Sequence, residues 1–183
     1  MLINAKDSLL LIIDIQEKLA PMMDSAREVI TNAAQLVELA QNLKIPFLII
    51  EQYPQGLGPT MADIRTKAGD KAKYIEKITF SGAKDTKVLQ AIKKSKKQQI
   101  IIAGIETHVC VTQTAIDLKN EGFDVFIVAD ACSSRGREQN IFGLQRMLQN
   151  NIEIITFEML FFEWFQKAGT PEFKELSKKF IVK

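Results

Sequence analysis

Unbroken apolar runs recur along the chain and are separated by longer segments in which apolar and polar residues mix. A run without polar alternation is typical of a strand that is buried on both faces of a parallel sheet. The runs are Ser8–Ile13, Phe47–Ile50, Gln99–Ala103, Val125–Val128 and Ile152–Ile155. Tyr74–Phe80 alternates in part and predicts one further, shorter strand.

The segments between these runs carry apolar residues at helical spacing, as Ile30, Ala33, Val37 and Ala40 do. The predicted helices are Ala26–Leu43, Lys84–Lys97, Val109–Asn120, Gln139–Leu148, Phe157–Phe165 and Pro171–Phe180. Two prolines and two glycines make 51–60 a predicted loop. The alternation of strand and helix continues without a break in composition, which predicts one α/β domain over residues 1–183 with a parallel sheet covered on both sides.

Composition narrows the class of protein. Apolar residues make up 46% of the 183 residues and charged residues 25%, as in ordinary globular proteins. A net charge of +2 gives no electrostatic reason to expect a nucleic acid or an acidic membrane as partner. The apolar runs are too short to cross a bilayer, and the first residues do not follow the pattern of a signal peptide. We therefore expect a cytoplasmic protein with a small-molecule partner.

A cysteine occupies the most informative position in the chain. Cys110 lies where the strand that ends at Ala103 gives way to a predicted helix. The free N–H groups and the positive dipole end of that helix favour a thiolate. We therefore predict that Cys110 is a nucleophile. The alternative is an inert, buried thiol, which is common for free cysteine.

Two charged residues could assist a thiol. Asp14 ends the first strand, where a carboxylate could accept the thiol proton or simply cap a loop. Lys77 is flanked by apolar residues, so its ammonium group would need a partner such as Asp14, unless Lys77 lies at the surface. His108 lies two residues before Cys110 and is expected to point elsewhere. Cys132 is most simply a packed thiol.

Cofactor sites of familiar types are disfavoured by the sequence. Two cysteines and one histidine are too few for a zinc site of the usual Cys/His composition. The turn after the first strand has no glycine, unlike the turn of a dinucleotide-binding fold, and the chain has no phosphate-binding loop motif. We predict neither a cofactor nor a metal.

Three segments together resemble the isochorismatase-like cysteine hydrolase family, and the resemblance runs from Ser8 to Phe157. They are Ile13-Asp14-Ile15-Gln16, Lys77-Ile78-Thr79-Phe80-Ser81-Gly82, and Gly104-Ile105-Glu106-Thr107-His108-Val109-Cys110-Val111-Thr112-Gln113-Thr114. The resemblance implies a three-layer αβα sandwich with a Rossmann-like, mostly parallel sheet. It also implies a triad in which Cys110 attacks, Asp14 accepts the thiol proton and Lys77 holds both groups electrostatically.

The resemblance implies further features of the site. A non-proline cis peptide is expected at Ile105–Glu106, where it would aim the N–H of Glu106, with that of Cys110, at an oxyanion. The residues implied to contact substrate are Gln16, Gln52, Tyr53, Phe80 and Ile105. Members of the family usually form homo-oligomers, so a dimer or tetramer is expected.

One departure from the family pattern bears on the substrate. Nicotinamidase members carry an Asp/His metal cluster in the loop after the second strand, whereas residues 51–58 include no histidine. That loop and Asp130–Arg135 resemble the isochorismatase domain-containing subgroup. We therefore expect a metal-independent cysteine hydrolase that cleaves a small amide or related C–N bond through a thioester. A non-catalytic binding or scaffold protein, and a thiol redox protein using Cys110 and Cys132, are the alternatives.

Overall fold

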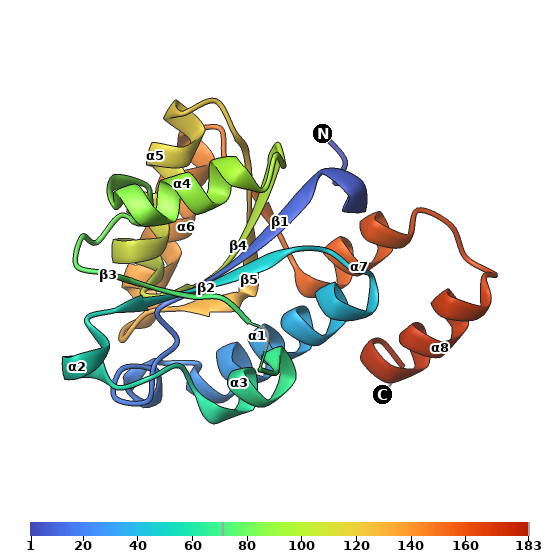
Figure 1. Ribbon diagram of the computed structural model, residues 1–183, viewed down its shortest axis with the longest axis horizontal. Coiled ribbons are helices and arrows are strands. Elements are labelled where there is room, and N and C mark those ends of the chain that lie inside the picture. The colour runs from blue at the N-terminus through green and yellow to red at the C-terminus, as the bar shows by residue number, and fades with distance from the viewer. Residues whose placement is uncertain (71, 183) are drawn as a thin grey trace.

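The sheet is parallel throughout, and its central strands are completely buried. The computed structural model describes residues 1–70 and 72–182. Within these residues six strands form a sheet in the order β3-β2-β1-β4-β5-β6 (Figure 1). Their bounds are β1 Ser8–Ile13, β2 Phe47–Gln52, β3 Tyr74–Lys77, β4 Gln99–Ile105, β5 Asp124–Ser133 and β6 Glu153–Ile155. Every residue of β1 and β4 is buried, which explains their unbroken apolar sequence.

Helices cover both faces of the sheet (Figure 1). One apolar cluster lies beneath four helices, namely α1 Ala26–Asn42, α3 Ala62–Ala68, α7 Phe157–Phe165 and α8 Pro171–Phe180. The other lies beneath three, namely α4 Thr86–Lys94, α5 Thr112–Asn120 and α6 Arg137–Gln149. The predicted three-layer αβα sandwich is therefore confirmed. None of the helices in the described ranges is long and apolar enough to span a membrane.

The structure differs from the sequence-based expectations mainly at the carboxyl ends of the strands. Strands β2 and β5 continue into polar residues that the apolar pattern excluded, and β4 continues through Gly104 to Ile105. Pairing continues there: Gln52 aligns with Lys77, and Ile105 with Ser133. The predicted loop after β2 contains a short helix, α2 (Pro54–Leu57), with proline at its first turn. Helix α3 was not predicted, because it buries only Ile64 and Ala68.

The order of the strands reverses between β1 and β4, so a crevice opens beyond their carboxyl ends. Gly104 lies at this position in β4, in register with Ile13 of β1. A Cβ atom on Gly104 would lie 2.3 Å from the carbonyl oxygen of Ile13. Its φ of 154° is also one that side chains rarely adopt. Glycine therefore allows the two central strands to approach each other just before the predicted nucleophile.

We expect Gly104→Ala to lower the free energy of unfolding by about 3 kcal/mol or more, since backbone atoms of β1 would have to move. Gly69→Ala is the matched control: Gly69 also has a positive φ, of 66°, but its Cβ would meet no atom within 4 Å. That change should cost about 1–3 kcal/mol of backbone strain and, without a clash, less than Gly104→Ala. Urea denaturation measures both. Equal losses would contradict the importance of the close approach.

Candidate active site

The structure brings Asp14 and Lys77 together from strands that are not neighbours. Asp14 follows β1, Lys77 ends β3, and β2 lies between the two strands. The Lys77 Nζ donates to Asp14 Oδ2 at 2.8 Å, and both side chains are 0% exposed. The same ammonium group donates to Gln52 Oε1 at 2.5 Å. The sequence-based expectation that Lys77 needs a buried partner is met by this ion pair.

Cys110 lies beside this ion pair and is 7% exposed. Burial raises the pKa of its thiol to about 12, the charge of Asp14 contributes to the increase, and the charge of Lys77 opposes it. Burial also raises the pKa of Asp14, whereas Lys77 and the Cys110 thiol act in the opposite direction. At neutral pH the thiol is therefore protonated and lies next to a carboxyl group that can accept its proton.

The two oxygens of Asp14 are in different environments. Oδ2 accepts from Lys77, whereas Oδ1 is buried and accepts no hydrogen bond from any other described residue. A buried carboxylate oxygen without a donor is costly unless a reacting group uses it. Oδ1 is thus the oxygen that is available to the thiol of Cys110.

Cys110 is carried by a π-helical turn, Thr107–Val111, which leads into α5. The carbonyl of Glu106 starts this turn by accepting from the N–H groups of Val109 and Val111, at 3.0 and 3.2 Å. The peptide bond Ile105–Glu106 is cis, at the position that the resemblance implied. The N–H of Glu106 finds no acceptor among the described residues.

The side chain of Glu106 has a separate role. Its Oε2 accepts from the backbone N–H of Arg135 at 3.0 Å and from Arg135 Nε at 3.1 Å. The carboxylate is therefore occupied by the loop that follows β5. The Glu106 carboxylate therefore connects this loop to the turn that carries Cys110.

The residues expected to contact substrate fall into two groups. Tyr53 and Phe80 are exposed, at 52% and 58%, and Ile78 is 71% exposed. The N–H of Tyr53 donates to the carbonyl of Lys77, which places this loop beside the catalytic candidates. Sequence reasoning missed Ile78, and its position directly after Lys77 is the signal that could have found it.

Gln16 and Ile105 are completely buried. Both amide atoms of Gln16 bond to backbone groups, and Ile105 packs in the apolar cluster beneath α1. Cys110 belongs to the cluster on the opposite face of the sheet. The surroundings of Gln16 and Ile105 therefore favour supporting roles.

His108 and Cys132 lie next to the candidate site without joining it. His108 Nδ1 is 2.9 Å from Ser134 Oγ. Cys132 is aligned with Gly104 across the two strands, and burial raises the pKa of its thiol to about 12. Both cysteines are free thiols.

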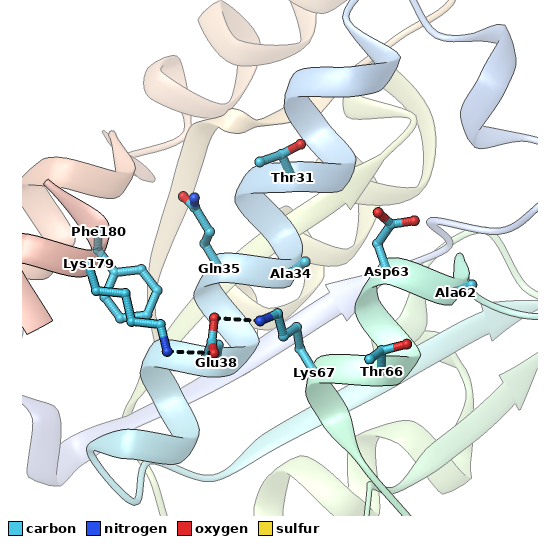
Figure 2. Close-up of a pocket in the computed structure, with 10 residues that line it drawn as sticks. All are labelled: Thr31, Ala34, Gln35, Glu38, Ala62, Asp63, Thr66, Lys67, Lys179 and Phe180. Atoms are coloured by element: carbon cyan, nitrogen blue, oxygen red, sulfur yellow. Dashed lines mark hydrogen bonds and ion pairs between the residues drawn. The ribbon is translucent and has the colours of Figure 1, made fainter. Parts of the chain in front are cut away.

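A cavity of about 650 Å³ lies elsewhere, between α1, α3 and α8 (Figure 2). Its most prominent polar feature is Glu38, whose carboxylate binds Lys67 at 3.0 Å and Lys179 at 2.7 Å. None of the predicted catalytic residues lines it. This cavity lies on the face of the sheet that carries α1, whereas Cys110 packs in the cluster on the opposite face.

The fold and the buried Asp–Lys pair beside a cysteine define an α/β protein with a cysteine-centred candidate site at the carboxyl edge of its sheet. The Isochorismatase domain model matches residues 8–159. The chain therefore belongs to the isochorismatase family, and the resemblance inferred from its three segments is confirmed.

Relatives and solved structures agree with this assignment. Isochorismatase domain-containing protein 2 of Danio rerio is 38% identical over 178 residues, which cover 96% of this chain and 88% of the relative. A Caenorhabditis elegans structure described as MAR1 ribonuclease has a TM-score of 0.92 at 34% identity, covering 99% of this chain and 93% of that chain. The Escherichia coli YcaC gene product, described as an octameric hydrolase of unknown specificity, has a TM-score of 0.87 at 23% identity, with 98% and 96% covered.

Asp14→Asn should lower the pKa of the Cys110 thiol below 12, because it removes a negative charge and leaves Lys77 in place. The rate of alkylation by iodoacetamide as a function of pH measures this shift. Asp63→Asn, on exposed α3, is the control and should leave the profile unchanged. A profile that stays in place or moves to higher pH in Asp14→Asn would contradict the arrangement.

Proposed function

We propose that the protein is a metal-independent cysteine hydrolase that cleaves a small amide or related C–N bond through a thioester. The observation that carries the proposal is the buried Lys77–Asp14 pair beside Cys110. Membership of the isochorismatase family supports the class of reaction. The raised pKa of Asp14 suits a group that must exchange a proton near neutral pH.

In the first half of the reaction, the Cys110 thiol transfers its proton to Asp14 while the sulfur forms a bond to the amide carbon. The carbonyl π electrons move to oxygen, and the N–H groups of Glu106 and Cys110 stabilise the oxyanion. When the oxyanion collapses, the C–N bond breaks, and the amine leaves with the proton that Asp14 held. The product on the protein is a thioester at Cys110.

In the second half, Asp14 takes a proton from water while the water oxygen attacks the thioester carbon. The C–S bond breaks, the carboxylic acid leaves, and the proton returns to the thiolate of Cys110. Throughout, the ammonium group of Lys77 offsets the negative charge that alternates between Asp14 and the sulfur.

The surroundings of the site suggest a small, partly apolar substrate. Among the exposed side chains near Lys77 along the chain and across the strands, Tyr53, Ile78 and Phe80 are aromatic or apolar, and Glu76 and Thr79 are polar. Their exposure would decrease if substrate or another copy of the chain covered this edge. We propose a homo-oligomer as the functional form, in line with the octameric assembly described for the E. coli neighbour.

Replacement of the nucleophile is the direct test. Cys110→Ala should reduce hydrolysis of an active member of an amide and ester panel by more than about 10³-fold, whereas Cys132→Ala should retain activity. Circular dichroism checks that both variants fold. Undiminished turnover in Cys110→Ala would contradict the proposal.

An RNA oligonucleotide belongs in the same panel, because the C. elegans neighbour is described as a ribonuclease. We expect no cleavage of RNA by the wild-type protein. Cleavage of RNA, together with no turnover of any amide or ester, would also contradict the proposal.

A disulfide between Cys110 and Cys132, found by mass spectrometry after mild oxidation, would instead favour the redox alternative.

A further inference from the structure

We propose that Gln52, itself held by Gln16, is the residue that fixes the Lys77 ammonium group beside Asp14 and Cys110. We call these two glutamines the glutamine brace. The inference deepens the proposed function, since it assigns a positioning role to residues that would otherwise be taken as substrate ligands. It rests on a continuous chain of side-chain hydrogen bonds from Lys77 to the loop after β2.

The first link is the contact between Gln52 and Lys77. An ammonium group has three N–H donors, and one that is buried needs an acceptor for each of them. Asp14 Oδ2 and Gln52 Oε1 supply two acceptors, at 2.8 and 2.5 Å. No acceptor for the third N–H is found among the described residues, and the charge of Lys77 acts to lower the pKa of the neighbouring Cys110 thiol. Without Gln52, the ammonium group would keep its ion pair but lose the contact that fixes its direction.

The second link fixes the orientation of the Gln52 amide. Its Nε2 donates to the carbonyl of Ile78 at 2.7 Å. Because that group must be the donor, Oε1 must face Lys77. A carboxylate at this position could accept from Lys77 but could not donate to Ile78. The amide thus has a donor and an acceptor in the arrangement that this site requires.

The third link is Gln16, which binds the backbone of Gln52 on both sides. Gln16 Oε1 accepts from the N–H of Gln52 at 2.8 Å, and Gln16 Nε2 donates to the carbonyl of Gln52 at 3.0 Å. The same Nε2 donates to the carbonyl of Gly58 at 2.7 Å. Gly58 ends helix α2, so the brace joins Lys77 to the segment that carries Tyr53.

The brace leaves its members little capacity to bind substrate. Oε1 and Nε2 of Gln52 are both engaged within the protein, and Gln16 is completely buried. A residue that acts through Lys77 affects the chemical step, whereas a substrate ligand affects binding. These roles predict different kinetic behaviour, because loss of a positioning contact lowers kcat and loss of a binding contact raises KM.

The test compares Gln52→Leu, Gln52→Glu and Gln16→Leu with the control Gln55→Leu. Gln55 lies in the same segment, but its only side-chain bond in the described structure is an exposed one to Glu76, at 3.2 Å. We expect Gln52→Leu and Gln16→Leu to lower kcat by about 10-fold or more with KM within about twofold, and Gln55→Leu to change neither.

Alkylation of Cys110 by iodoacetamide tests the brace without any turnover. Gln52→Leu should move the pH profile upward by about one unit, since Lys77 no longer faces the sulfur. Gln52→Glu keeps an acceptor for Lys77 but adds a negative charge, so its profile should also move upward. Circular dichroism confirms that each variant is folded.

The kinetic constants depend on turnover, whereas the pH profile of Cys110 alkylation does not, so the two measurements separate this inference from the proposed function. A shifted alkylation profile supports the brace even if the wild-type protein hydrolyses no amide. An unshifted profile in folded Gln52→Leu and Gln52→Glu, or a raised KM with unchanged kcat, would overturn it and identify Gln52 as a substrate ligand.

Discussion

The ion pair between Lys77 and Asp14 is the constraint on which the rest of the site depends. Both side chains are completely buried, and removal of two charges from water costs several kcal/mol per ion before their attraction offsets it. Such a pair is a poor source of stability compared with apolar packing. The presence of this ion pair at the carboxyl edge of the sheet is best explained by the chemistry of the neighbouring Cys110.

The fold makes this juxtaposition possible because the strands that supply the charges are arranged around β2. Strand β3 has four residues, and its last, Lys77, extends past Gln52 to reach Asp14 after β1. On the other side of β1, Gly104 allows β4 to approach closely enough for the following turn to present Cys110. Three strands thus lead to Asp14, Lys77 and Cys110, and Gln52 at the end of a fourth, β2, binds the lysine.

Much of this arrangement could be predicted from the sequence. The apolar runs indicated five of the strands, because strands buried on both faces leave a clear pattern. Asp14 and Cys110 became candidates because they follow predicted strands, and Lys77 because its neighbours are apolar. The family resemblance implied all three. The sequence suggested Asp14 as a partner of Lys77, but it could not give the second partner, Gln52. Gln52 and Lys77 are 25 residues apart, and only the register between β2 and β3 shows that they meet. Helix α3, with two buried residues, left too weak a pattern to be found.

The proposed function requires Cys110 to form a covalent bond to substrate carbon. It is tested most directly by rapid acid quenching of the wild-type protein with a hydrolysed amide or activated ester, followed by intact-mass and peptide mass spectrometry. We predict an adduct with the mass of the acyl group on the peptide that contains Cys110, and no adduct on the peptide that contains Cys132. Steady turnover without any acylated Cys110 at the earliest quench times, or an acyl group on another residue, would contradict it.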